Sequence, residues 1–246
     1  MRMSPLDRIF ASRRFRHSWL RLKWLMGKYG PYFQLNDREK MINLAMRFAK
    51  MNEIEGDYFE FGVGEGFTLG TAVRLAEWFG LDKMMFYGFD SFKGLPVSSG
   101  VFKEGDYAYS PEDAAKNIPR SDRVYLYECW YNVLPTPIKG CPLFRMWNAD
   151  GKYIGNGSVP VPGTKAAIVW IDCDLYSSTR DALRFVEHYM QDGTIICLDD
   201  YYCFRGHPCQ GERRAFDNWL DGKNPFYETP WHQFGWHGQS FIIHKD

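Results

Sequence analysis

Two short apolar runs, each followed by aspartates, constrain the fold of this chain more than any other feature. The run at 166–171 is followed by Asp172-Cys173-Asp174, and the run at 194–198 is followed by Asp199-Asp200. Short, nearly continuous apolar runs are typical of buried strands in a parallel sheet. The carboxyl ends of such strands meet at one edge of the sheet, where open α/β folds bind ligands. The sequence therefore predicts four carboxylates close together at a ligand site.

Strand and helix signals alternate along the rest of the chain. Alternation of this kind indicates a mainly parallel, Rossmann-type sheet covered by helices on both faces. Right-handed crossovers place the carboxyl ends of its strands along one edge. We expect helices at 5–28, 37–53, 68–79, 111–117, 178–190 and 211–220, strands at 58–61, 84–89, 124–127, 166–171 and 194–198, an inserted loop or hairpin at 137–164, and a final antiparallel strand at 239–244.

Bulk properties are those of one large soluble α/β domain. The chain has 246 residues, which is enough for a substantial core. Its formal net charge is zero, so nucleic acid is not favoured as a partner. No apolar stretch approaches membrane-spanning length, and the beginning of the sequence lacks the apolar core of a signal peptide. The six cysteines follow no disulfide framework, so we expect a reducing, cytoplasmic setting.

The first fifty residues are basic and rich in aromatic side chains, with Arg13, Arg14, Trp19 and Trp24 among them. We expect residues 1–50 to form a helical lid or dimer contact ahead of the main domain at 51–246, and the protein to be a homo-oligomer. An amphipathic helix lying on an anionic membrane is the alternative. It is less favoured because the apolar residues do not gather cleanly on one side of the helix.

A glycine-rich turn, Glu60-Phe61-Gly62-Val63-Gly64-Glu65-Gly66, joins the first strand to its helix. Glycines allow a tight turn and let a ligand lie directly on the backbone. The dinucleotide fingerprint would need another glycine at Phe67, and no Gly-Lys-Ser/Thr follows as in a P-loop. An acidic residue before the glycines suits an ammonium or sulfonium group, and S-adenosylmethionine carries both. A glycine turn that binds no ligand is the alternative.

Asp90 ends the second expected strand, in the position of a carboxylate that accepts both ribose hydroxyls of a nucleoside. The neighbouring Ser91 and Gly94 also favour a simple turn at this point. A nucleoside contact and a turn aspartate are therefore both compatible with the sequence.

The clustered aspartates predict a divalent cation. Four converging carboxylates repel one another unless a cation or proton lies among them. Their hard oxygen atoms suit Mg²⁺ or a similar ion rather than zinc, although aspartates that only cap loops are the alternative. The spacing of Cys203, His207 and Cys209 also suggests a soft-metal site, but no fourth ligand accompanies them. We favour His207 as a substrate contact.

Five blocks of sequence together resemble the macrocin-type sugar O-methyltransferases, which depend on S-adenosylmethionine and a divalent metal. The resemblance runs from about Gly56 to the final strand and implies a class I methyltransferase-like fold. Residues 1–50 show no such resemblance. The blocks are Glu60-Phe61-Gly62-Val63, Phe89-Asp90-Ser91-Phe92-Lys93-Gly94-Leu95-Pro96, Trp130 with Leu134-Pro135, Ile171-Asp172-Cys173-Asp174-Leu175-Tyr176-Ser177-Ser178-Thr179, and Asp199-Asp200-Tyr201.

The resemblance implies a role for each acidic residue. Asp172, Asp199 and Asp200 would bind the metal, and Asp174 would be the general base. If Asp174 proves to be a metal ligand, His207 is our own next candidate for the base. The acceptor would be a saccharide or another small molecule. Cys129 stands where such enzymes commonly have glycine, and the 137–164 segment is long, so the acceptor remains open. The expected cofactor contacts are Glu60, Gly62, Val63, Gly64, Asp90, Ser91, Trp130 and Asp172.

Two other functions fit part of the pattern. A glycosyltransferase could use Asp172-Cys173-Asp174 to hold Mn²⁺ against a nucleotide sugar, although the glycine turn and Asp199-Asp200 argue against it. A non-catalytic nucleoside-binding protein could share the same fold. Because side chains alternate across a strand, we expect Asp172 and Asp174 to point to the same side and Cys173 to point away.

Overall fold

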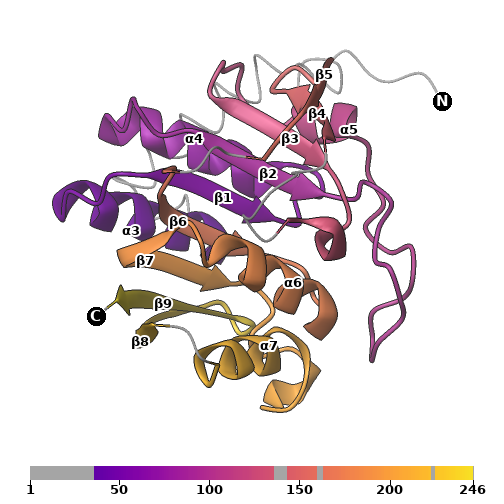
Figure 1. Cartoon of the computed structure of the whole chain (residues 1–246), viewed down its shortest axis with the longest axis vertical. Coiled ribbons are helices and arrows are strands. Elements are labelled where there is room, and N and C mark those ends of the chain that lie inside the picture. Colours follow the sequence, from indigo (N-terminus) through magenta and orange to yellow (C-terminus); the bar gives the residue numbers. More distant parts are fainter. Residues whose placement is uncertain (1–35, 136–142, 160–162, 223–224, 246) are drawn as a thin grey trace.

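A nine-stranded sheet lies at the centre of the molecule, with strand order β5-β4-β3-β2-β1-β6-β7-β9-β8 (Figure 1). The computed structural model describes residues 36–135, 143–159, 163–222 and 225–245. The strands are β1 (Asp57–Phe61), β2 (Phe86–Asp90), β3 (Val124–Glu128), β4 (Phe144–Asn148), β5 (Tyr153–Gly157), β6 (Ala166–Ile171), β7 (Met190–Leu198), β8 (Phe226–Phe234) and β9 (Gly238–Lys245).

Helices connect the strands and cover both faces of the sheet. The α-helices are α3 (Asp37–Met51), α4 (Phe67–Phe79), α5 (Pro111–Ala115), α6 (Tyr176–Val186) and α7 (Gly211–Leu220), and two short 3-10 helices are η1 (Tyr131–Val133) and η2 (Phe204–Gly206).

The predicted parallel sheet is confirmed. Strands β3, β2, β1, β6 and β7 run parallel in this spatial order, so their carboxyl ends share one edge. The chain moves outward from β1 in both directions, which places the ends of β1 and β6 side by side at the switch in strand order. Strand β9 runs antiparallel to β7, as expected for the final strand.

Side chains alternate between two hydrophobic cores, one on each face of the sheet. Tyr58 and Trp170 face the core formed with α3 and α4. Phe59 and Phe61 face the opposite core, formed with α6 and α7. In the second core the rings of Phe61 and Phe89 lie 5.0 Å apart and 12° from parallel. Because β1 and β6 are buried on both faces, the loops that follow them have a rigid base.

Helix α3 packs on the sheet as part of the main core. Asn36 caps its first turn in a capping box with Glu39, and its apolar face buries Met41, Ile42 and Met46. The helix therefore starts abruptly at a fixed point next to the sheet. The predicted helix at 5–28 lies outside the described residues, so the division of the chain at residue 50 stays a prediction.

The structure differs from the sequence-based prediction mainly in its outer strands. The 137–164 segment contains the antiparallel hairpin β4–β5, which extends the sheet beyond β3. The sequence did not predict strand β8, because it is an exposed edge strand with little hydrophobic alternation and with Pro230 near its middle. Helix α6 ends earlier than expected, and β7 begins earlier, at Met190.

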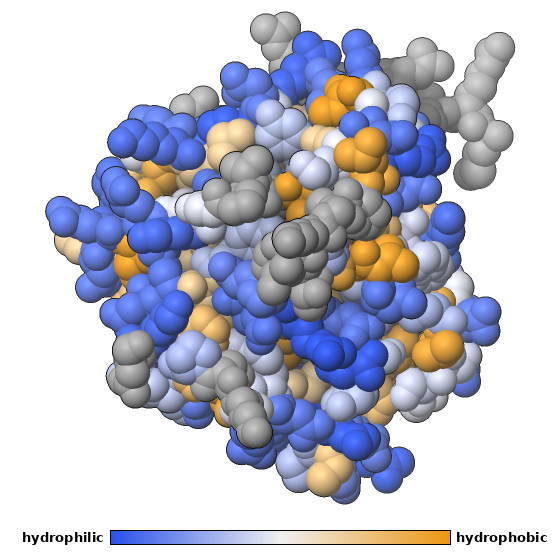
Figure 2. Space-filling model, viewed as in Figure 1, coloured by the Kyte–Doolittle hydropathy of each residue, from blue (hydrophilic) through white to orange (hydrophobic). Residues whose placement is uncertain are grey.

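The described surface gives no sign of a membrane-spanning element. In the parts of the chain that the structure describes, every helix is too short or too polar to cross a bilayer. Figure 2 shows a mainly hydrophilic face on which hydrophobic residues form small, separate areas.

We expect Gly62→Ala to lower the free energy of unfolding by about 2–5 kcal/mol, from backbone strain and a clash together. Gly62 has φ +92°, and a Cβ atom there would lie 1.8 Å from the carbonyl oxygen of Asp172. Gly105→Ala is the matched control, because Gly105 has φ +82° but no atom within 4 Å of the added Cβ. Denaturant unfolding of both variants checks the prediction, and equal losses would contradict the close approach at Gly62.

Candidate active site

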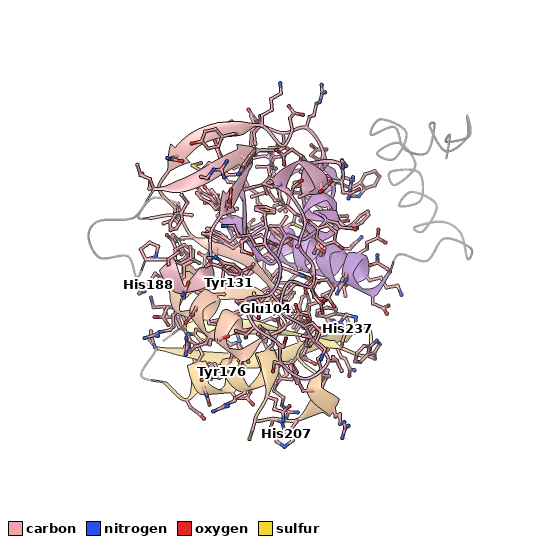
Figure 3. All side chains as sticks on the ribbon, turned by 90° about the vertical axis from the view of Figure 1, so that its right-hand side faces the viewer. Glu104, Tyr131, Tyr176, His188, His207 and His237 are labelled. Carbon is pink, nitrogen blue, oxygen red and sulfur yellow. The ribbon has the colours of Figure 1, made fainter. Side chains whose placement is uncertain are left out.

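A cavity of about 1040 Å³ opens at the edge where the parallel strands end. Figure 3 looks onto this side of the molecule, with Glu104 near the centre and Tyr131 beside it; both residues line the cavity. Most of the sequence-predicted site residues therefore come together here. Those that line the cavity are Gly62, Val63, Gly64, Asp90, Ser91, Trp130, Asp172, Asp174 and Asp200.

The glycine turn and Asp90 form one half of the cavity. The backbone N–H of Gly64 donates to Asp90 Oδ2 at 2.9 Å, and that of Phe92 donates to Asp90 Oδ1 at 2.7 Å. Burial raises the pKa of Asp90, while these bonds oppose the shift. The Asp90 side chain is thus held in one orientation beside a turn whose backbone is open to a ligand.

Ser91 and Trp130 complete this half of the cavity in different ways. The hydroxyl of Ser91 accepts from the N–H of Lys93 at 3.0 Å and donates to the carbonyl of Gly94 at 3.2 Å. Ser91 is therefore largely occupied in forming the turn that the sequence also allowed. The N–H of Cys129 donates to the carbonyl of Asp90 at 2.8 Å, which places Trp130 next to the end of β2.

Glu60 lies beneath the glycine turn and does not line the cavity. Its side chain is fully buried, and its Oε2 accepts from the hydroxyl of Tyr58 at 2.6 Å. Burial raises its pKa to about 8. The expected contact between Glu60 and a ligand is therefore not direct in this conformation.

The acidic half of the cavity is built by the turns after β6 and β7. Carboxylate oxygens of Asp172, Asp174 and Asp200 all lie within 4.8 Å of one another. Asp172 and Asp174 therefore share one side, as expected, but the reason differs. Strand β6 already ends at Ile171, and Asp174 has φ +58°, so a turn brings the two carboxylates together.

Cys173 points away from this cluster. It is buried, and its thiol donates to the carbonyl of Phe61 at 3.5 Å. This contact ties the acidic turn to the end of β1.

Burial and mutual repulsion raise the pKa values in the acidic half. Burial is the main cause for Asp172, and the charges of Asp199 and Asp200 add to it. For Asp174, burial and then the charge and hydrogen bond of Asp200 raise the pKa to about 8. Without a bound cation, some of these carboxylates would therefore have to be protonated, which lowers the negative charge of the cluster.

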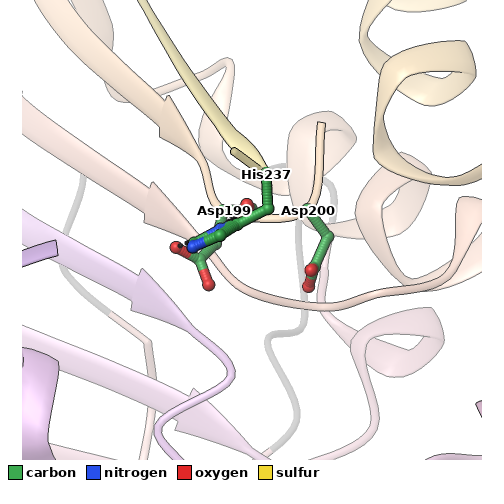
Figure 4. Close-up of side chains that lie close together, drawn as sticks. All are labelled: Asp199, Asp200 and His237. Carbon is green, nitrogen blue, oxygen red and sulfur yellow. Dashed lines mark hydrogen bonds and ion pairs between the residues drawn. The ribbon is translucent and has the colours of Figure 1, made fainter. Parts of the chain in front are cut away.

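Asp199 faces two residues that the sequence did not suggest. Its side chain is 0% exposed, and its Oδ2 accepts from Arg38 Nε at 2.7 Å and from the neighbouring Nη2. His237 donates from Nδ1 to the backbone carbonyl of Asp199 at 2.6 Å and lies 3.6 Å from its Oδ1. Figure 4 shows the carboxylate of Asp199 beside the ring of His237, with the carboxylate of Asp200 directed elsewhere.

A third residue absent from the prediction, Glu212, lies behind the acidic turns. It is fully buried and accepts backbone N–H groups from Cys173 and Asp200. Arg38, His237 and Glu212 come from α3, the β8–β9 turn and α7. In the sequence, Glu212 follows a glycine at the start of a helix, which is only a weak indication of a site residue. Nothing near Arg38 or His237 in the sequence marks them as site residues.

The residues present fit a divalent cation. Asp199 Oδ1 is buried without a hydrogen-bond partner, an arrangement that costs free energy unless another group approaches it. Two clusters of potential ligands share Asp200: one with Asp172 and Asp174, the other with Asp199 and His237. Carboxylate oxygens predominate in both, which suits Mg²⁺ or Mn²⁺.

The loop after Asp200 does not form a soft-metal site. His207 is exposed at the edge of the molecule, away from Glu104 and Tyr131 (Figure 3). It accepts the N–H of Cys209 at 3.1 Å and does not line the cavity. Cys203 donates its thiol to Asp200 Oδ1 at 2.9 Å. His207 is therefore not placed to take a proton from a substrate in this cavity.

Neither protein-family models nor curated sequences give a significant match to this chain. Solved structures do match. The O-methyltransferase NovP is 19% identical over 85% of this chain and 80% of its own, with a TM-score of 0.59. The calicheamicin methyltransferase CalS11 is 18% identical over 98% of this chain and 94% of its own, with a TM-score of 0.58. An apo structure of CalS11, a TDP-rhamnose 3'-O-methyltransferase, is 19% identical over 98% of this chain and 96% of its own, with a TM-score of 0.50.

These similarities establish the fold. The chain has a class I methyltransferase-like architecture, with flanking helices and a final antiparallel strand, as the sequence predicted. At such low identity the fold alone is shared, so activity and substrate must be argued from the cavity.

We expect Arg38→Met to lower the free energy of unfolding of the metal-free protein by about 1–3 kcal/mol, because Asp199 would lose its charged partner. The half-exposed guanidinium limits the loss. Lys40→Met is the control, since among the described residues Lys40 pairs with the exposed Asp37. Denaturant unfolding in EDTA measures both variants. An Arg38 variant no less stable than the Lys40 variant would show that Asp199 does not need this partner.

Stability of the metal-free protein should fall as the pH rises from about 4 to about 8. Asp174 has a pKa of about 8 in the folded protein, above its ordinary value of 3.8, so the folded state binds more protons over this range. Asp174→Asn should reduce the fall. Denaturant unfolding across the range in EDTA tests this, and a stability that rises with pH would contradict the assignment.

Proposed function

We propose that this chain is an O-methyltransferase that uses S-adenosylmethionine and Mg²⁺ or another divalent cation. The proposed acceptor is a hydroxyl of a sugar, a glycosylated natural product or a polysaccharide. One observation carries the proposal: a single cavity joins the glycine turn and Asp90 to the cluster of Asp172, Asp174 and Asp200. The sugar methyltransferase named among the structural neighbours, CalS11, and the sequence blocks described above support the choice of acceptor.

The glycine half of the cavity suits the nucleoside of the cofactor. Gly62 and Gly64 line the cavity, so a ligand could lie against the turn, and the fixed carboxylate of Asp90 could accept ribose hydroxyls. Trp130, on the same wall, offers an apolar surface. These residues would hold the cofactor so that its methyl group faces the acidic half.

The acidic half suits the acceptor. Asp172 and Asp200 would hold the cation together with Asp199, whose Oδ1 has no hydrogen-bond partner while its Oδ2 accepts from Arg38. A bound cation would lower the pKa of a coordinated hydroxyl. Asp174 would accept the hydroxyl proton while the acceptor oxygen bonds to the methyl carbon and the carbon–sulfur bond of the cofactor breaks. In the cation-free site, burial and the neighbouring Asp200 raise the pKa of Asp174 to about 8, which is compatible with a role in accepting a proton.

Binding and transfer assays test the proposal and separate it from the alternatives. Calorimetry should detect binding of S-adenosylmethionine but not of UDP-glucose, and methyl transfer to a panel of glycosides and nucleotide sugars should require a divalent cation. Binding of UDP-glucose alone would favour a glycosyltransferase. Binding of S-adenosylmethionine without transfer to any acceptor would favour a non-catalytic protein. Full activity in excess EDTA would exclude the cation.

Asp174→Asn should cut the rate of methyl transfer by about two to four orders of magnitude, because the variant keeps the side-chain shape but loses the basic oxygen. The affinities for cation and cofactor should change little. Asp172→Asn should instead weaken cation binding, and excess Mg²⁺ should restore part of its activity. Steady-state kinetics against Mg²⁺ concentration compare the two. If excess Mg²⁺ rescues both variants equally, Asp174 is a ligand and not the base.

A further inference from the structure

Glu212 is a buried carboxylate that connects the two acidic turns from behind. Its Oε1 accepts the N–H of Cys173 at 3.0 Å, and its Oε2 accepts the N–H of Asp200 at 2.9 Å. The side chain is 0% exposed and does not line the cavity. One side chain therefore sets the distance between the turn that carries Asp172 and Asp174 and the turn that carries Asp200.

The position of Glu212 in its helix stabilises this arrangement. It lies in the first turn of α7, where the partial positive charge of a helix N-terminus favours a carboxylate. No Lys or Arg side chain pairs with Glu212 among the described ion pairs, and burial raises its pKa. The fold therefore keeps a fifth acidic side chain directly behind four aspartates, although a neutral group would avoid this repulsion. Such an arrangement is costly unless a cation binds in front of it.

We propose that Glu212 is a positioning residue of the cation site, and this rests on the cation dependence proposed above. Its two hydrogen bonds hold the backbone of both acidic turns, so that the carboxylates of Asp172, Asp174 and Asp200 converge before a cation binds. Glu212 contacts neither the cation nor the substrate, and its effect passes through Cys173 and Asp200.

Glu212→Gln tests this role, because the amide keeps the shape but can accept only one of the two N–H groups. We expect calorimetry with Mn²⁺ to show an affinity at least about tenfold weaker than in the wild type. Binding of S-adenosylmethionine at the glycine half should be unchanged. Hydrogen exchange in EDTA should be faster in at least one of the peptides that contain Cys173 and Asp200.

Phe216→Leu is the matched control for loss of stability. Phe216 lies on the same helix, is 1% exposed, and packs with its ring 4.5 Å from that of Phe241. This variant should unfold at a lower temperature but bind Mn²⁺ as the wild type does. Equal Mn²⁺ affinity in Glu212→Gln and wild type, or equal weakening in both variants, would overturn the positioning role. Absence of Mn²⁺ binding by the wild type would overturn the proposed cation dependence and this role together.

Discussion

Repulsion among buried carboxylates is the constraint on which the site depends. Four aspartates end two adjacent parallel strands, and Glu212 lies behind them, while one guanidinium, that of Arg38, lies among their side chains in the described structure. Burial and repulsion raise the pKa values of Asp172 and Asp174. The fold holds these groups together by hydrogen bonds from the backbone, and this arrangement is most favourable when a cation is bound.

The close contact between β1 and the turn after β6 joins the two halves of the cavity. Gly62 leaves room for the carbonyl of Asp172, and a side chain at this position would keep the two loops apart. The thiol of Cys173 and the carbonyl of Phe61 reinforce the same junction. A ligand on the glycine turn would therefore lie next to the acidic cluster, which is the geometry that transfer of a group between two substrates requires.

The central part of this structure could be predicted from the sequence because its signals are local. Strand β6 and the second half of β7 are short apolar runs, and their aspartates follow directly in the chain. The glycine turn and Asp90 were also recognised from neighbouring residues. The same local patterns gave the parallel sheet, since alternating strands and helices leave few other arrangements.

Residues brought to the site by distant elements could not be predicted in this way. Arg38 precedes Asp199 by 161 positions, and it resembles any other arginine near a helix N-terminus. His237 and Glu212 likewise acquire their roles only when β9 and α7 pack beside β7. The conformation of Asp174 was also missed, because a residue with φ +58° follows from the requirements of the turn and not from strand alternation.

The central claim is that one cavity binds both the cofactor and a divalent cation. Crystals grown with S-adenosylhomocysteine and MnCl₂ test it through the anomalous scattering of manganese. The account predicts an anomalous peak within coordination distance of Asp172 and Asp200, and density for the nucleoside on the glycine turn beside Asp90. A well-occupied nucleoside with no manganese peak at the aspartates, or a nucleoside bound outside this cavity, would contradict it.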